Sequence, residues 1–151
     1  DFLYDTQYFI MKYRDCASIR KMRIEQGLEK SVEWKIKDFL TSLQKKFGYN
    51  FAIWGAGTES ISIISTLLRM GYDFQIFDNA KYGEEIWESA NKYIHSFEEF
   101  EGQKIDIVFI TSDFYFKVIQ EQIHKKYPMI KIVNFIRAIR NLAYTEKEKQ
   151  E

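Results

Sequence analysis

Hydrophobic positions recur with a helical period in the first third of the chain, and short apolar runs replace that period afterwards. Within residues 1–47, Thr6 fits the N-cap of a first helix and Gly27 fits a break after it. Ser31 would cap a second helix that ends at Gly48. The apolar positions of this second helix form a single stripe: Val32, Ile36, Phe39, Leu40, Leu43 and Phe47.

After Gly48 the pattern predicts short strands alternating with helices. The predicted strands are 51–54, 73–77, 93–94, 105–110 and 130–135, the predicted helices are 59–70, 97–100, 114–126 and 136–144, and 78–91 is a loop. Ser96 would cap the short helix, and Val118, Ile119 and Ile123 would face inward from the third one. This alternation favours a parallel sheet with right-handed crossovers, whose strands lie in the order third, second, first, fourth, fifth.

The first strand, Phe51–Trp54, ends at a Gly-x-Gly turn, and an amphipathic helix begins at once. The second strand ends in Asp78, 21 positions after Gly57. This is the outline of a nucleotide-binding βαβ unit. The sequence therefore predicts an α/β fold, a Rossmann-like three-layer sandwich with a mainly parallel sheet of about five strands, counted from these runs. It divides into a helical N-terminal element (1–47), the Rossmann-like domain (48–144) and a charged tail (145–151).

The turn itself offers the first candidate ligand contacts. Backbone groups of Gly55, Ala56, Gly57 and Thr58 would donate to a phosphate at the N-terminus of the helix; the alternative is that Gly-Ala-Gly is only a tight turn. Ser60 occupies the place of the usual third glycine and is small enough for close packing of helix on strand. Glu59 would repel a pyrophosphate, whereas a ligand with a cationic group, such as S-adenosylmethionine, would tolerate it.

Two further pairs of residues complete the candidate site. Asp78 and Asn79 follow the second strand, where an acid accepts hydrogen bonds from ribose hydroxyls; alternatively, both residues simply begin a turn. Thr111 and Ser112 follow the fourth strand, beside the glycine turn at the point where the strand order reverses. The alternative there is that Ser112 or Asp113 caps the next helix. Tyr115 would either cover the same ligand site or lie on the protein surface.

Composition limits the chemistry that the chain can carry. Of 151 residues, 22 are Lys or Arg and 22 are Asp or Glu, so no net charge attracts nucleic acid or an anionic membrane. One cysteine, Cys16, and two histidines, His95 and His124, offer neither an internal disulfide nor a metal cluster. His95 and His124 lack an obvious acid–base partner, and His124 should be exposed. We therefore predict no catalytic and no metal-ligating residues. We expect a cytoplasmic protein without a membrane span, and the start at Asp1 fits a piece of a longer protein.

The stretch 50–135 resembles the Rossmann-like domains of carbohydrate-modifying enzymes, namely sugar-nucleotide enzymes and the C-terminal domain of sugar C-methyltransferases. The resemblance lies in three short segments: Ile53-Trp54-Gly55-Ala56-Gly57, Phe77-Asp78-Asn79 with Lys81 and Gly83, and Asp106-Ile107-Val108-Phe109-Ile110-Thr111-Ser112. The helix before them, 31–47, is also similar to the one that leads into such domains. Glu59 and Ser60 depart from the usual phosphate-binding pattern. The resemblance implies a ligand-binding or assembly module within a larger enzyme.

Three hypotheses follow for the function. The first is a nucleotide-binding module (NAD-like or nucleotide-sugar) of a larger sugar-modification enzyme, not catalytic by itself. The second is part of a methyltransferase that uses S-adenosylmethionine, or of an NAD-dependent oxidoreductase, completed by another domain. The third is a structural or interaction domain without a small ligand, whose N-terminal helices dock a further domain or a second copy. Fold alone does not choose among them.

Overall fold

The computed structural model describes residues 22–86 and 92–143, so the predicted cap at Thr6 lies outside the described residues. Helix α2 runs without interruption over Met22–Phe47. The predicted break at Gly27 and the cap at Ser31 are therefore wrong. A glycine inside a helix costs about 1 kcal/mol relative to alanine, which a long helix with many hydrogen bonds tolerates. The predicted stop is confirmed, because Gly48 has a φ of 128° and its N–H donates to the Gln44 carbonyl at 2.9 Å.

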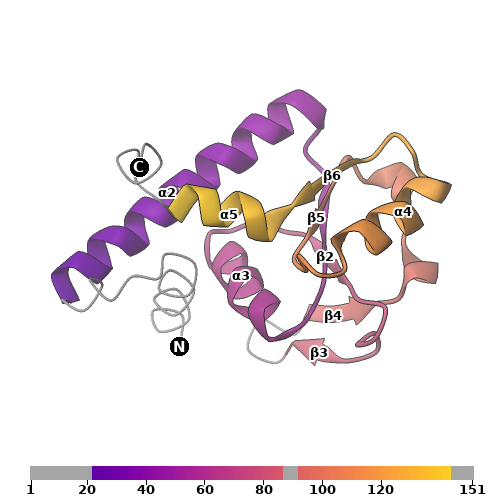
Figure 1. Cartoon of the computed structure of the whole chain (residues 1–151), viewed down its shortest axis with the longest axis horizontal. Coiled ribbons are helices and arrows are strands. Elements are labelled where there is room, and N and C mark those ends of the chain that lie inside the picture. The colour runs from indigo at the N-terminus through magenta and orange to yellow at the C-terminus, as the bar shows by residue number, and fades with distance from the viewer. Residues whose placement is uncertain (1–21, 87–91, 144–151) are drawn as a thin grey trace.

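The sheet has the predicted parallel core, with one additional edge strand (Figure 1). Its strands are β1 (Phe51–Trp54), β2 (Gln75–Phe77), β3 (Glu85–Ile86), β4 (Lys92–His95), β5 (Ile107–Ile110) and β6 (Lys131–Asn134). They lie in the order β3-β4-β2-β1-β5-β6, and every pair is parallel except β3 with β4. The predicted order of the five parallel strands is confirmed. The segment predicted as a loop contains β3, which is too short for its periodicity to show in the sequence.

The four predicted helices connect these strands with bounds shifted by one or two residues, and a short 3₁₀ turn at Gly102–Lys104 is present that the sequence did not predict. These elements are α3 (Thr58–Arg69), η1 (Phe97–Glu99), η2 (Gly102–Lys104), α4 (Phe116–Lys126) and α5 (Phe135–Ala143), where η marks a 3₁₀ turn. Ser96 does cap η1, since its N–H donates to the Glu99 carboxylate at 3.1 Å and its carbonyl accepts from the Glu99 N–H. No helix of the described part of the chain is long and apolar enough to span a membrane.

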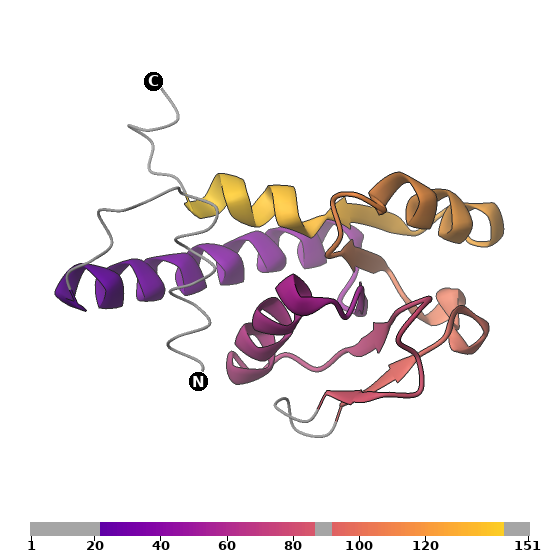
Figure 2. The ribbon, with the colours of Figure 1, turned by 60° about the horizontal axis from the view of Figure 1, so that its bottom comes forward.

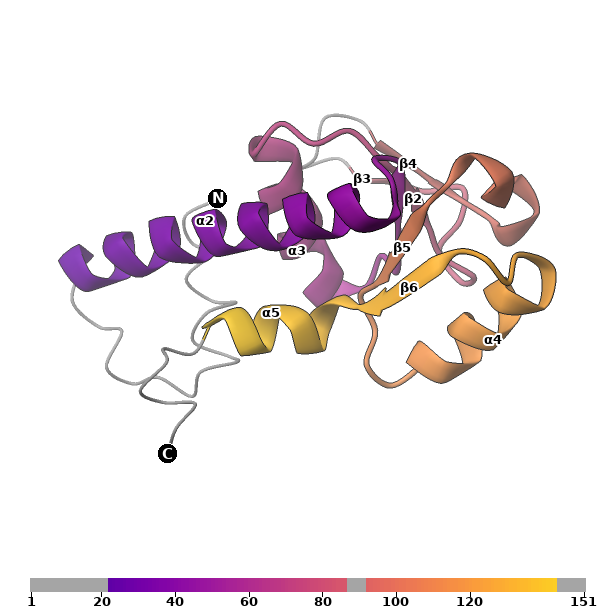
Figure 3. The same ribbon diagram turned by 90° about the horizontal axis from the view of Figure 1, so that it is seen from above.

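Helices cover both faces of the sheet, which makes the fold an α/β, Rossmann-like three-layer sandwich. Alternate strand residues face opposite sides, so Ile53 packs with α2, α3 and α5 while Trp54 packs with α4 and η1. Figures 2 and 3 show α2 and α5 running side by side, and their residues are in contact. The α2 stripe joins this core directly, with Ile36 and Leu40 buried within it.

Helix α4 differs from the prediction at one inward position. Ile119 and Ile123 are buried against the sheet as expected, but the side chain of Val118 is 62% exposed. Residues four apart share a helix face, whereas Val118 lies about 100° around the helix from Ile119. Val118 therefore faces the carboxyl end of the sheet, where it takes part in the candidate site described next.

Candidate functional site

A cleft of about 820 Å³ lies at the carboxyl ends of β1, β2 and β5, where the strand order reverses. Open α/β sheets bind ligands at this place, and binding pockets commonly measure about 300–1,000 Å³. All the candidate residues except Ala56 line the cleft: Gly55, Gly57, Thr58, Asp78, Asn79, Thr111 and Ser112. The fold therefore brings together side chains and backbone from three loops that are far apart in the sequence.

The two glycines of the turn, Gly55 and Gly57, differ in whether the fold requires a glycine at their position. Gly55 has a φ of 123°, a conformation that other residues rarely adopt, and a side chain there would clash with the hydroxyl of Thr111. Gly57 has an ordinary φ of −73° and would place a side chain in open space within the cleft. The internal structure therefore requires a glycine at position 55 and places no such requirement on position 57.

Asp78 holds the backbone on two sides of the cleft. Its Oδ2 accepts the N–H of Ala56 at 2.8 Å, and its Oδ1 accepts the N–H groups of Ala80 and Lys81 at 2.7 and 2.9 Å. The turn-forming alternative is thus present in the structure, together with a link to the glycine turn. The backbone N–H of Ala56 donates to Asp78, so this N–H group is directed at the carboxylate and Ala56 does not line the cleft. A carboxylate has about four acceptor positions, so Asp78 retains one for a ligand hydroxyl.

Thr111 and Ser60 form a buried hydroxyl pair behind the glycine turn. Their Oγ atoms lie 2.7 Å apart, and the Thr111 hydroxyl is also within hydrogen-bond distance of the carbonyls of Trp54 and Gly55, at 3.1 and 3.2 Å. Both residues are only 3% exposed. Thr111 therefore ties the ends of β1 and β5 to α3, and Ser60 permits the close helix–strand packing that the sequence predicted.

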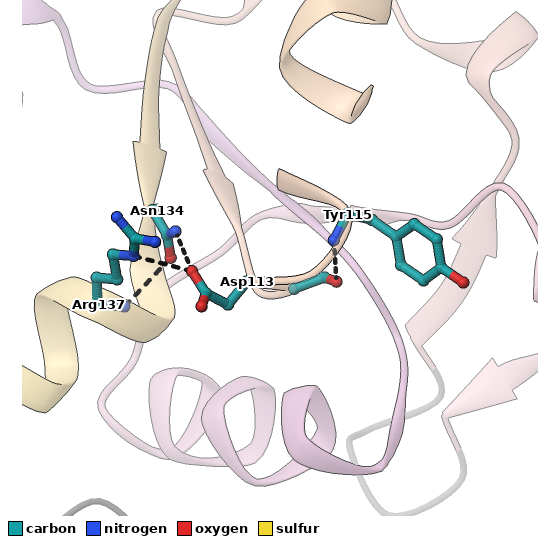
Figure 4. A network of polar contacts seen from close by, with 5 residues as sticks. Asp113, Tyr115, Asn134 and Arg137 are labelled. Atoms are coloured by element: carbon teal, nitrogen blue, oxygen red, sulfur yellow. Dashed lines mark hydrogen bonds and ion pairs between the residues drawn. The ribbon is translucent and has the colours of Figure 1, made fainter. Parts of the chain in front are cut away.

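Ser112 and Asp113 do not cap α4 as proposed from the sequence. The helix begins two residues later than predicted, at Phe116, and its N-cap Tyr115 makes no side-chain cap. Ser112 Oγ instead accepts the Tyr115 N–H at 3.1 Å, in the turn before the helix. Figure 4 shows the Asp113 carboxylate turned towards β6 and α5, away from the Tyr115 ring.

Asp113 belongs to a polar network at the end of β6. Its Oδ1 accepts from Asn134 Nδ2 at 2.8 Å and from Arg137 Nε at 2.9 Å. Asn134 Oδ1 in turn accepts the Arg137 N–H at 3.2 Å, which caps α5. The hydrogen bond from Asn134, with the charges of Arg137 and Arg140, holds the pKa of Asp113 below its ordinary value of 3.8.

Exposed apolar side chains form one wall of the cleft. Phe114 is 87% exposed and Tyr115 57%, with their ring centroids 4.8 Å apart in an edge-to-face arrangement, and Val118 lies one turn further along. Asn79, which lines the cleft, donates from Nδ2 to Gln122 Oε1 of α4 at 2.9 Å. Sequence reasoning missed Phe114, Val118 and Gln122. Phe114 offered a signal, because it is not among the positions predicted to face inward, whereas Val118 is among them.

The histidines have partners that the sequence did not indicate. His95 Nδ1 lies 2.8 Å from the Glu99 carboxylate, and this hydrogen bond is the main cause that lowers the pKa of Glu99. His124 is half-buried, and its Nε2 donates to the Ile130 carbonyl at 2.9 Å. The prediction that His95 lacks an acid–base partner is therefore wrong, because Glu99 lies one turn further along the chain. The prediction that His124 is exposed is also wrong, because the tertiary fold places it against the Ile130 carbonyl. Neither histidine lines the cleft, and residues 22–86 and 92–143 contain no cluster of side chains that could hold a metal ion.

Comparisons with protein-family models, curated proteins and solved structures find no match for this chain. The resemblance to carbohydrate-modifying enzymes therefore stays a prediction. Because a fold alone does not give a function, the interpretation of the cleft depends on its own geometry.

Proposed function

We propose that the chain is a nucleotide-binding module, NAD-like or nucleotide-sugar, of a larger sugar-modification enzyme and that it is not catalytic by itself. The observation that carries this proposal is Gly57. This residue has an ordinary φ, lines the cleft and would point any side chain into open space. Gly57 is the N-cap of α3, where glycine is accepted but not required, and a glycine at the N-terminus of a helix and at the switch point of the sheet lets a phosphate approach the backbone.

The binding contacts follow from the same geometry. The N–H groups of Gly57 and Thr58 have no acceptor in the part of the chain that the structure describes, as expected at the start of a helix. These groups and the helix dipole favour an anion. Asp78 has an acceptor position for a ribose hydroxyl, and Lys81 is a cation that lines the cleft.

The aspartates of the cleft support a module without its own chemistry. Asp78 accepts three backbone N–H groups, and Asp113 accepts from Asn134 and Arg137. Both carboxylates thus accept hydrogen bonds that hold the loops around the cleft in place. In this proposal, a further domain or subunit supplies the reacting groups.

One observation favours the second hypothesis, a part of an enzyme that uses S-adenosylmethionine. Glu59 lies in the first turn of α3 and lines the same cleft. Its carboxylate would oppose a pyrophosphate at this helix N-terminus, whereas it would attract the positive sulfonium of S-adenosylmethionine. The two hypotheses share the cleft and differ in the charge of the ligand group near α3.

A thermal-shift panel on paired Gly57 variants tests the proposal. The ligands are NAD, NADH, NADP, S-adenosylmethionine, S-adenosylhomocysteine and nucleotide sugars, each at millimolar concentration. A ligand present at 100 times its Kd should stabilise the protein by about 2.7 kcal/mol, a shift of several degrees. Gly57→Asp and Gly57→Asn should both fold well, since Asp and Asn are good N-caps, so any lost shift reports on binding.

The outcomes separate the hypotheses. For a phosphate ligand, Gly57→Asp should abolish the shift and Gly57→Asn should weaken it less, because the two differ mainly in charge. A larger response to S-adenosylmethionine than to any phosphate ligand would move the second hypothesis to first place. A flat panel in the unmodified protein would reject ligand binding and favour an interaction domain.

A further inference from the structure

We infer that the amino end of the sheet docks an acidic segment of a partner protein, and that an apolar side chain of this segment sits in a hollow beside Phe47. The hollow measures about 420 Å³ and is bounded by the segments that precede β5 and β6 and by the last residues of α2 and α4. The candidate cleft lies at the carboxyl ends of the strands, so this inference concerns a second surface and goes beyond the proposed function.

Apolar side chains are left exposed at the amino-end hollow. Met129 is 93% exposed and Phe47, the last residue of α2, is 36% exposed, and Tyr127 and Pro128 lie beside them in the lining. Only Ile130, which is 6% exposed, turns inward to the core under α4. Methionine and aromatic side chains that remain exposed as a group are typical of the centre of a protein interface.

Lysines flank the two aromatic rings of this surface. The Nζ atoms of Lys46 and Lys131 lie 5.5 and 5.2 Å from the centroid of the Phe47 ring, and that of Lys126 lies 5.4 Å from the centroid of the Tyr127 ring. Within the described part of the chain, no acidic side chain forms an ion pair with these three lysines. The helix dipole favours a lysine in the last turn of α2 or α4, but it does not account for Lys131 on β6.

The acidic residues near the hollow have partners of their own. Asp106 lines the hollow, and its Oδ2 accepts the N–H of Asn50 at 3.1 Å, in the loop after α2. Glu101, before β5, pairs with Lys104. The three lysines at the aromatic rings therefore leave positive charge that an acidic partner would complement.

The distribution of these charges favours a peptide over a compact anion. The lysines come from α2, α4 and β6 and flank two different rings, so their charges are spread around the hollow. A segment with acidic residues on both sides of an apolar one places carboxylates near several lysines and its apolar side chain among Phe47, Tyr127 and Met129. An apolar centre within a charged rim is the anatomy of an interface between proteins.

Binding of a synthetic peptide tests the inference. The probe is a fluorescein-labelled peptide with glutamates on both sides of one phenylalanine, and fluorescence anisotropy at low ionic strength measures its Kd. One control peptide has alanine in place of the phenylalanine, and another has glutamines in place of the glutamates. Each replacement should weaken binding by about fivefold or more. No binding of the probe at millimolar concentration, or an unchanged Kd with either replacement, would overturn the inference.

Variants of the protein show where the peptide binds. Lys126→Glu combined with Lys131→Glu should weaken the probe by about tenfold or more. Met129→Ser should also weaken it and should fold normally, because Met129 is 93% exposed. Lys117→Glu is the matched control, since Lys117 is exposed in the first turn of the same helix α4 and should leave the Kd unchanged. An equal loss of affinity in Lys117→Glu would show non-specific attraction and contradict the inference.

Two further measurements distinguish other occupants of the surface. Sedimentation with vesicles of equal parts phosphatidylcholine and phosphatidylserine tests a membrane, and analytical ultracentrifugation of the protein alone tests a second copy. Binding to vesicles without binding to the peptide would contradict the inference, and so would self-association that the combined lysine variant abolishes. The ligands of the cleft are measured separately, so either result leaves the proposed function unchanged.

Discussion

At the scale of single residues, some groups that the sequence predicted to contact a ligand make hydrogen bonds within the fold instead. Ala56 donates to Asp78, and Thr111 is a buried link between strand ends. Polar groups that become buried need partners, and the nearest ones in a folded chain come from neighbouring loops. Gly57 differs from Gly55 because the fold does not require a glycine at its position, and for this reason it carries the functional proposal.

The Asp113 network makes stability depend on pH. Its pKa is lowered in the folded state, so the unfolded chain binds protons at higher pH than the folded chain does. The stabilisation is present above the ordinary pKa of 3.8 and is lost as the pH falls through the lowered value. Asn134→Ala should raise the pKa of Asp113 towards 3.8, as measured by NMR titration of its carboxyl carbon.

A second aspartate provides the internal control for this titration. The pKa of Asp73 is lowered by a hydrogen bond from Lys92, which is remote from the network. Asn134→Ala should leave the pKa of Asp73 unchanged. An unchanged pKa of Asp113 in this variant would show that Asn134 does not stabilise the carboxylate.

At the scale of elements, α2 is one helix where the sequence predicted two. The pattern of good helix formers on both sides of Gly27 outweighs one unfavourable residue. Gly48 differs, because its φ of 128° and its contact with the Asp106 side chain leave no space for a Cβ. Gly27 therefore lies inside a continuous helix, whereas Gly48 ends it, and the residue type alone does not distinguish these two roles.

Substitution by alanine distinguishes a glycine inside a helix from a glycine that ends one. Gly27→Ala should stabilise the protein by about 0.5–1 kcal/mol, since alanine loses less backbone freedom in a helix interior. Gly48→Ala should destabilise it, because alanine is strained at positive φ. Urea unfolding measures both changes. A loss of stability in Gly27→Ala would mean that the chain breaks at this residue in solution.

At the scale of the whole molecule, α2 belongs to the same core as the sheet. Leu40 is fully buried and packs in one cluster with strands β1, β2, β4 and β5 and with α3 and α5. Contact between α2 and α5 joins the two ends of the described chain (Figure 1). The helix therefore contributes to the stability of the sheet domain that follows it.

Truncation of one buried side chain tests this coupling. Leu40→Ala should lower the free energy of unfolding by about 2–5 kcal/mol, because it removes apolar contacts and leaves a cavity. Trp34→Ala is the control on the same helix, since Trp34 is 68% exposed, and it should change stability by less than about 0.5 kcal/mol. Trp fluorescence and circular dichroism should report one transition in Leu40→Ala. Two separate transitions would show that α2 unfolds independently of the sheet.

The sequence by itself determined the class of the fold, the strand order and the position of the cleft. These follow from local signals, because hydrophobic periodicity and glycine turns act over a few residues. Partners from distant segments were decided only by the tertiary structure: Asp113 with Arg137, His124 with the Ile130 carbonyl, and the separate reasons for Gly55 and Gly57. The hydrogen-bond partners of a side chain depend on which loops come together at the end of the sheet. Residue type and spacing along the sequence do not determine which loops these are.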